Sequence, residues 1–385
     1  MINISDKSKC SGCHSCASIC PKNCIEMVVD NEDLLYPQID TSKCVNCGLC
    51  EKSCPIITRK EINKTENDIS AFAAYTKNEE IRLNSSSGGL FTEIATYVIN
   101  NGGAVFGAAF NEDFSVSHQS ATTVEELAKF RGSKYVQSTI GNTYNEVKSI
   151  LKEGKLVLFT GTPCQIGGLY SYLNKDYDNL ITQDIICHGA PSPMVWKKYK
   201  EYQENKNGSK LQSVQFRNKD TGWKTYSVVF SFENGSKCMQ KSENDMYIRS
   251  FISNLCLRPS CYDCSFKTAI RQSDITLADF WGIENVIPEM DNDKGNSLLL
   301  INSQKGKALF EKIKDNITYK EADLNEALKY NSAATQSVQK PQNRDLFIST
   351  IKKEGFEKIQ DKFFKKTMLT KIKIKIKNFI KRILN

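Results

Sequence analysis

The chain has 385 residues, of which 40% are hydrophobic and 25% charged, as expected for a globular protein with a small module and one or two larger units. It has no run of about 18 apolar residues and no apolar segment of the secretory-signal kind at its start, which predicts a cytoplasmic chain without a membrane span. The formal charge of +8 equals the eight Lys and Arg residues of segment 365–385, which has no acidic residue. The rest is formally neutral, so nucleic-acid binding by the folded part is not expected.

The first 55 residues contain a repeated cysteine pattern. Eight of the fifteen cysteines fall in two runs of the form C-x2-C-x2-C-x3-C-P, the second beginning 34 residues after the first. In the absence of a secretion signal, such clustering predicts metal ligation rather than disulfides. The first run is Cys10, Cys13, Cys16 and Cys20, and the second is Cys44, Cys47, Cys50 and Cys54.

This spacing resembles that of ferredoxin domains with two 4Fe-4S clusters, in which the fourth thiolate of each cluster comes from the other run. The first cluster is therefore expected to use Cys10, Cys13, Cys16 and Cys54, and the second to use Cys44, Cys47, Cys50 and Cys20. Zinc also binds C-x2-C pairs, but it leaves the third cysteine of each run and the Cys-Pro step unexplained. Cys24 breaks the repeat and is expected to be a packed thiol, and His14 is expected to be a surface residue.

The elements expected along the chain change after the cysteine module. Residues 27–40 predict a short hairpin and the polar segment 58–68 a linker. The core that follows has periodic patterns for strands at 71–76, 103–110, 155–160 and 180–187, and for helices at 90–100, 123–130 and 143–154. Segments 214–219 and 223–240 predict antiparallel strands, with Asn234-Gly235 as a hairpin turn.

These mixed parallel and antiparallel signals predict an α+β fold. We expect a two-cluster ferredoxin module at 1–57, the linker at 58–68, a mixed α/β core at 69–340 and a helical basic tail at 341–385.

Four cysteines of the core lie at the ends of predicted elements. Cys164 follows strand 155–160 near the start of a helix, where a thiolate is stabilised, and Cys187 ends segment 180–187. Cys261 and Cys264 form a further C-x2-C pair. Four thiolates are the number that a third 4Fe-4S cluster needs. The alternative is that Cys164 and Cys187 are buried as small hydrophobic residues.

The core has two other cysteines, Cys238 and Cys256. Cys256 is a competing ligand for the third cluster, and Cys238 lies on the predicted hairpin, where no metal role is expected.

Segment 365–385 predicts a basic amphipathic helix that contacts an anionic membrane surface peripherally. One helical face would carry Met368, Leu369, Ile372, Ile376, Phe379, Ile380 and Ile383. The alternation of Lys and Ile over 371–377 also fits a strand, and docking of the apolar face on the body of the protein is a further alternative.

Five core segments resemble, in order, the beta subunit of coenzyme F420 hydrogenase/dehydrogenase. They are SSSGGLFTEIATYVI (85–99), RGSKYVQS (131–138), GTPCQIGGL (161–169), CHGAPSP (187–193) and LRPSCYDCSFKTAIRQSDITLADFWG (257–282). The resemblance implies an iron–sulfur flavoprotein in which FAD passes electrons between clusters and a substrate that donates or accepts hydride. It also supports the third cluster, because family members without a ferredoxin module still carry one. It does not imply that the deazaflavin coenzyme itself is the substrate.

The resemblance also suggests which residues meet the flavin. Backbone N–H groups and hydroxyls at the helix start are expected to bind its phosphates, although an ordinary helix cap is the alternative. The expected contacts are Ser86, Ser87, Gly88, Gly89, Lys134, Tyr135 and Thr162.

His188 is the candidate catalytic residue, as a proton donor beside the flavin, unless it is purely structural. Phe216, Arg217 and Trp223 either touch the substrate or pack on a sheet.

The sequence therefore predicts an iron–sulfur flavoprotein oxidoreductase. It would relay electrons between an external one-electron carrier and a small-molecule substrate, through the two N-terminal clusters, a third cluster and FAD. Two alternatives remain: a non-catalytic electron-transfer subunit of a larger redox complex, and a membrane-tethered assembly protein with structural clusters.

Overall fold

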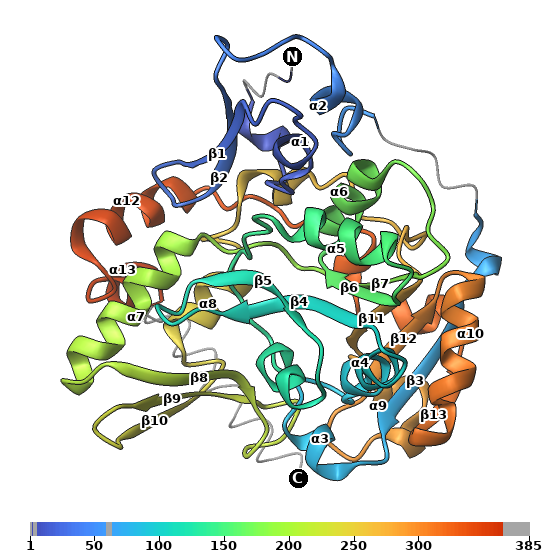
Figure 1. The fold of residues 1–385 in the computed structure, drawn as a ribbon. Helices are drawn as coiled ribbons and strands as arrows, with labels where there is room; N and C mark the ends of the chain where they lie inside the picture. The colour runs from blue at the N-terminus through green and yellow to red at the C-terminus, as the bar shows by residue number, and fades with distance from the viewer. Residues whose placement is uncertain (1, 3–5, 59–63, 365–385) are drawn as a thin grey trace.

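The computed structural model describes residues 2, 6–58 and 64–364, and it shows a cysteine-rich module seated on one end of a larger core (Figure 1). The module is the dark blue part at the top of the figure, where β1, β2, α1 and α2 are labelled. The mixed α/β architecture and the N-terminal ferredoxin-like module are those predicted from the sequence.

The module consists of one hairpin and two short helices. Strands β1 (Ile25–Val29) and β2 (Leu35–Ile39) pair in antiparallel fashion, and the helices are α1 (Ser15–Ser18) and α2 (Leu49–Lys52). His14 and Gly48 precede the two helices at equivalent positions of the repeat, with φ of 65° and 73°. A left-handed backbone favours glycine, so His14 occupies a turn position. It is buried, with 6% exposure, and the prediction of a surface residue was wrong.

The core is built on an eight-stranded mixed sheet in the order β13-β3-β12-β11-β7-β6-β4-β5. Strands β4, β6, β7 and β11 run parallel to one another, so their carboxyl ends share one edge. In α/β sheets that edge is where ligands bind. The strands are β3 (Ser70–Thr76), β4 (Ala104–Phe110), β5 (Val116–Ala121), β6 (Val157–Gly161), β7 (Leu180–Ile185), β11 (Ile275–Asp279), β12 (Ser297–Ile301) and β13 (Ile317–Ala322).

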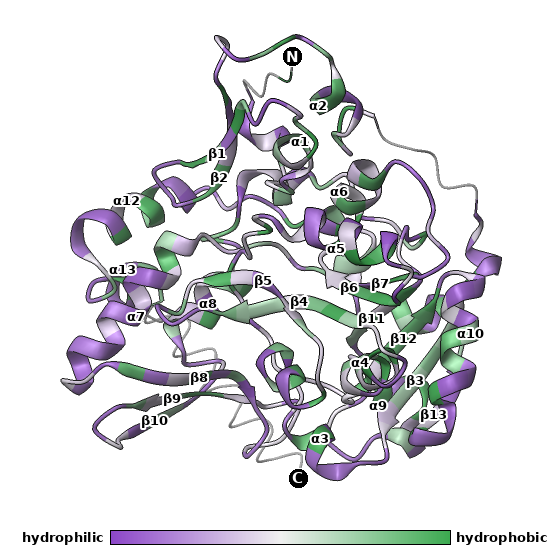
Figure 2. Ribbon diagram, viewed as in Figure 1, coloured by the Kyte–Doolittle hydropathy of each residue, from purple (hydrophilic) through white to green (hydrophobic). Residues whose placement is uncertain are grey.

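Helices cover both faces of this sheet because each carries an apolar stripe. On one face Ile94 and Val98 of α4 pack with Leu309 and Phe310 of α10, and the other face is covered by α5 and α6, with α9 and α11 beyond them. Figure 2 shows apolar residues along the central strands. The helices are α3 (Glu79–Leu83), α4 (Leu90–Asn100), α5 (Thr143–Lys152), α6 (Pro163–Leu173), α9 (Ile283–Val286), α10 (Gln304–Ile313) and α11 (Leu324–Leu328).

A second sheet of three antiparallel strands, in the order β10-β9-β8, packs with helices α7, α8 and α12 around an aromatic core. Tyr199, Tyr247 and Phe347 are fully or almost fully buried there. The predicted turn is present, with Gly235 at φ of 80°. The elements are α7 (Pro193–Asn207), β8 (Leu211–Asn218), β9 (Ser227–Phe232), β10 (Lys237–Lys241), α8 (Met246–Ile252), α12 (Arg344–Glu354) and α13 (Ile359–Phe363).

One prediction about local structure was wrong, and another concerns residues that the structure does not describe. Residues Glu125–Phe130 form a 3-10 helix rather than the α-helix expected over 123–130, because the segment is one short connection between β5 and the 131–135 loop. The basic segment 365–385 lies outside the described residues. Among the helices that are described, none is long and apolar enough to cross a bilayer.

Candidate functional site

The first group of thiols combines both runs of the module. Burial raises the pKa of Cys16 to about 12, and the neighbouring thiols of Cys10 and Cys54 add to the rise. Cys54, which follows α2, is buried and has its pKa raised by that burial, with Cys10 again contributing. A ligand from the second run therefore lies among ligands of the first, which is the crossover that the repeat predicts.

The second group of thiols shows the reciprocal arrangement. Cys20, from the first run, lines one small cavity together with Cys44, Cys47 and Cys50 of the second run. Cys47 is exposed, so this group reaches the surface of the module. Cys24 lies on the cavity wall with its sulfur 3.3 Å from that of Cys20. The neighbours in both groups are compatible with the ligand sets expected from spacing, which stay a prediction.

The third group of thiols is assembled at the carboxyl edge of the large sheet. Cys164 is the second residue of α6, Cys187 follows β7, and Cys261 lies in a 3-10 helix (Pro259–Asp263) that Cys264 ends. Burial raises the pKa of Cys164, Cys187 and Cys261 to about 12 each, and each is raised further by other thiols of these four. The four predicted cysteines are therefore brought together from three distant segments.

The pKa of Cys164 is raised rather than lowered, because loss of hydration outweighs the hydrogen bond from Thr162 and the charge of Arg258. A metal centre bound here would supply the missing stabilisation, since its ligands bind as thiolates. Hydrogen-bond donors already face two of the sulfurs: the Ala190 N–H lies 3.3 Å from Cys261 Sγ, and Thr162 Oγ1 lies 3.1 Å from Cys164 Sγ. The competing ligand Cys256 is instead buried in the aromatic core of α7 and α8.

The binding of a single metal ion must be distinguished from the binding of a 4Fe-4S cluster. In the part of the chain that is described, no three His, Cys, Asp or Glu side chains are arranged to hold one such ion. The fit of the third group to a 4Fe-4S cluster rests on its four half-buried thiols and the donors that face two of them.

The module meets the core where the first and third thiol groups approach each other. A β-carbon added at Gly168 of α6 would lie 3.1 Å from Cys13 Sγ, so the missing side chain lets the Cys13 loop sit on α6. Burial raises the pKa of Cys13, and Cys164 is among the thiols that add to the rise. The two groups are therefore electrostatic neighbours.

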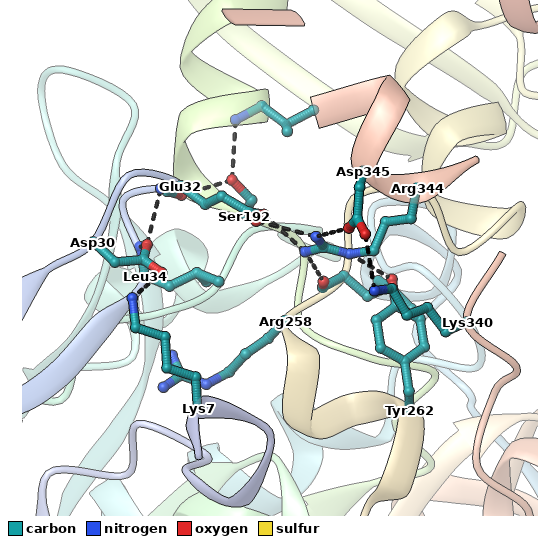
Figure 3. Close-up of polar contacts among 12 residues, drawn as sticks. Lys7, Asp30, Glu32, Leu34, Ser192, Arg258, Tyr262, Lys340, Arg344 and Asp345 are labelled. Carbon is teal, nitrogen blue, oxygen red and sulfur yellow. Dashed lines mark hydrogen bonds and ion pairs between the residues drawn. The ribbon is translucent and has the colours of Figure 1, made fainter. Parts of the chain in front are cut away.

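The hairpin of the module is fixed to the core at a second place (Figure 3). Glu32, between β1 and β2, accepts hydrogen bonds of 3.0 and 2.7 Å from Arg344 of α12, and its carbonyl accepts one of 2.7 Å from Ser192. Arg344 is buried and also donates to the Leu257 carbonyl at 2.7 Å. These contacts hold the module in one position on the core.

A polar nest lies farther along the same sheet edge, at the end of β11. Arg217 of β8 pairs with Asp279 at 2.7 Å and lies 3.5 Å from the Tyr135 hydroxyl. The Ser86 hydroxyl bonds with Ser133 at 2.9 Å. We define the polar nest as Ser86, Ser133, Lys134, Tyr135, Arg217, Lys219 and Asp279.

The polar nest contains more positive than negative charge. Asp279 is the acid that pairs with Arg217, whereas Lys134 and Lys219 contact backbone carbonyls. Burial lowers the pKa of each lysine to about 7. Since buried cations are normally paired, the excess charge fits an anionic ligand such as a pyrophosphate.

The other residues predicted to bind a flavin divide into two sets. Ser87 Oγ donates to the Asn296 carbonyl at 2.6 Å and the Gly88 N–H donates to Ser297 Oγ at 3.0 Å, so both serve to fix this loop to β12. Gly89 is the left-handed residue before α4. Thr162 contacts Cys164 and therefore lies with the third thiol group, not in the polar nest.

His188 lies between the third thiol group and the polar nest. Its Nε2 is 2.7 Å from Asn254 Oδ1, and its ring packs edge-on against Phe251, which stacks on Tyr135. Burial lowers its pKa, so the ring is neutral at pH 7. Phe216 packs among aromatic rings, and Trp223 stacks on Trp281 while donating to Asp279 at 3.2 Å.

Sequence reasoning missed Lys219 and Asp279. Lys219 follows β8, and Asp279 lies within the segment 257–282 that carried the family resemblance. Only the approach of β8 to the end of β11 shows that the two belong to one site.

Three parts of the chain match known protein families. Residues 9–56 match a 4Fe-4S dicluster domain. Residues 71–143 and 154–327 match the N-terminal and C-terminal parts of the coenzyme F420 hydrogenase/dehydrogenase beta subunit.

Two individual proteins are similar to the chain. An uncharacterized protein of Methanocaldococcus jannaschii is 25% identical over 204 residues, which cover 46% of this chain and 56% of that protein. A chain of the F420-reducing NiFe hydrogenase complex from Methanosarcina barkeri aligns with a TM-score of 0.47 and 18% identity, over 68% of this chain and 89% of that one. Neither likeness assigns an activity to this chain.

Proposed function

The chain belongs to the coenzyme F420 hydrogenase/dehydrogenase beta-subunit family and carries a 4Fe-4S dicluster domain, and from this premise we propose that it is an iron–sulfur flavoprotein oxidoreductase. It relays single electrons between an external carrier and a flavin that exchanges two electrons with a small-molecule substrate. The family is one of oxidoreductases. The flavin, the third cluster and the direction of the reaction belong to the proposal.

One observation carries the proposal: the thiol groups and the polar nest form a continuous series. The second group reaches the surface at Cys47, and the first contacts α6 through Cys13, next to Cys164. Ile185 pairs with Leu277 between β7 and β11. Cys187 and Asp279 each follow two residues later, and from this register we infer that the third group lies near the polar nest.

The residues of the third group fit a 4Fe-4S cluster. Cys164, Cys187, Cys261 and Cys264 would hold it, and when bound it would supply one-electron transfer between the module and the flavin. The chain's own part is to exclude water from these thiols and to direct hydrogen-bond donors at them, as Ala190 and Thr162 do. Such donors and burial are the means by which proteins tune cluster potentials.

The residues of the polar nest fit the phosphates of FAD. When bound, a flavin couples one-electron carriers to hydride chemistry. Lys134, Lys219 and Arg217 supply positive charge, and the Ser86 and Ser133 hydroxyls supply donors. His188 Nε2 hydrogen-bonds Asn254 Oδ1, and the neutral ring is the proposed proton donor of the site once it has taken up a proton itself.

An anaerobic preparation of the full chain tests the proposal. We expect iron, sulfide and flavin in one sample, and bleaching of the flavin absorbance after the clusters are reduced by dithionite. Arg217→Met should lose flavin and retain iron, because it removes a charge of the polar nest without touching the thiols. Clusters without flavin in the unmodified protein would contradict the enzyme and identify an electron-transfer subunit.

A further inference from the structure

A buried arginine occupies the junction between the module and the third thiol group. Arg258 is 1% exposed and directly precedes the 3-10 helix that holds Cys261. Its guanidinium donates to the Cys10 carbonyl at 2.7 Å and to the Leu35 carbonyl at 2.8 Å, and it lies 4.3 Å from the centre of the Tyr36 ring. One side chain of the core thus contacts both the first cluster loop and the hairpin of the module.

Arg258 differs from Arg217 and Arg344, the two buried arginines described above, because its hydrogen-bond partners are neutral groups. Arg344 pairs with Glu32, and Arg217 pairs with Asp279. Besides the two carbonyls and the ring, Arg258 has the Gln137 side chain at 3.1 Å, and no carboxylate of the described residues pairs with it. A buried guanidinium without a carboxylate is costly unless another anion balances it.

When bound to a cluster as thiolates, the cysteines on both sides of Arg258 would be the anions that balance its charge. Burial raises the pKa of Cys164 and of Cys261, and the charge of Arg258 opposes that rise in both. A β-carbon at Gly12, between Cys10 and Cys13, would lie 2.8 Å from Arg258 Nη1, so the guanidinium also adjoins the first ligand loop. None of the residues that line the cavity of the second thiol group is among the contacts of Arg258 named above.

We propose that Arg258 is a positioning residue for electron transfer, whose charge stabilises the reduced state of the first and third clusters relative to the second. The inference rests on the proposed function. Reduction of a cluster adds one electron and forms or breaks no bond, so a nearby fixed cation favours the reduced form. Electrons arriving at the exposed second cluster are thereby drawn inward.

Two other positive charges near the third group would also stabilise its reduced state, but they do not contact the module. Lys267 donates to the Cys187 carbonyl and to the Ala333 carbonyl, and Arg271 lies near Asp184, at 3.8 Å. Arg258, by contrast, contacts the first ligand loop and directly precedes the helix that carries Cys261.

Redox titration followed by electron paramagnetic resonance, on the full chain with its clusters, tests this role. Arg258→Met should shift the ratio of reduced to oxidised first and third clusters about tenfold toward the oxidised form at a fixed potential, or about 59 mV for a one-electron couple. The second cluster should not shift. Arg258→Lys keeps the charge and should stay close to the unmodified protein.

A matched control tests whether the effect needs a buried charge or whether any nearby positive charge would produce it. Lys9 adjoins Cys10 in sequence and pairs with Asp263 across the same junction, but its side chain is 56% exposed, so Lys9→Met should leave all potentials unchanged. If Arg258→Met does not fold, Arg258→Gln replaces it as the neutral variant.

Two outcomes would overturn the role of Arg258: unchanged potentials in the neutral variant, or an equal shift of all clusters. An equal shift in Arg258→Lys would also overturn it, because charge would not be the cause. About eight irons in the unmodified protein would remove the third cluster from the proposed function, and the shift of the first cluster alone would then decide the role of Arg258.

Discussion

The cysteines of the module and those of the core are brought together in two different ways. In the module, three ligands of each cluster lie within one short loop, and only the fourth crosses over. In the core, Cys164 and Cys187 are brought to one edge because β6 and β7 end there, and Cys261 and Cys264 come from the distant 3-10 helix Pro259–Asp263. The module's ligands therefore follow from local spacing, whereas the core's ligands follow from the topology of the fold.

The largest expected effect comes from removing a ligand of the core. Cys261→Ala should lower the iron content by about four atoms per chain and leave the two clusters of the module intact, because their ligands are separate. Metal analysis of anaerobic samples measures the change. Cys238→Ala on β10 is the control and should retain all the iron. A loss of all iron in Cys261→Ala would show that the two regions do not load independently.

Proton delivery in the core should be the next most sensitive property. His188→Gln should slow the proton uptake that accompanies flavin reduction by about a hundredfold, since a positioned acid contributes on that order. Cluster and flavin contents should not change. Stopped-flow mixing with a pH-indicator dye measures the rate, and an unchanged rate would leave His188 a structural residue that supports Phe251.

The contact between the two regions should contribute to stability. Arg344→Met leaves the Glu32 carboxylate without its main partner at a site where both side chains are nearly buried, and should lower the free energy of unfolding by about 2 kcal/mol. Anaerobic urea unfolding measures the loss. The exposed pair of Lys340 and Asp345 provides the comparison, and Lys340→Ala should have little effect. Equal losses in both variants would argue against a fixed module.

The smallest expected effect is the pH dependence of flavin binding. Burial lowers the pKa of Lys134 and Lys219 to about 7, so both are mostly charged at pH 6 and mostly neutral at pH 8.5. An anionic ligand binds the charged form better, so affinity for FAD should be highest below pH 7 and fall about tenfold as pH rises through 7. Calorimetric titration of flavin-free protein measures this. The double variant Lys134→Met/Lys219→Met should bind weakly and without this pH dependence.

The difference between the module and the core also explains which site residues could be identified from the sequence. The cysteines of the module need only their spacing, and the core cysteines could be chosen because each ends a predicted element. Lys219 and Asp279 could not be identified from the sequence, because they meet through a contact between β8 and β11, which are far apart in the chain. Ser87 and Gly88 resemble a phosphate loop, yet their polar groups are used by β12. His14 was misjudged because its turn position, not its polarity, decides its burial.

The most direct test of the relay is the iron and acid-labile sulfide content of one anaerobic sample of the full chain. Three thiol groups that each hold a cubane predict about 12 irons per chain and an equal amount of sulfide. About eight irons would remove the core cluster and break the series between Cys13 and the polar nest. Zinc in place of iron would contradict electron transfer by this chain altogether.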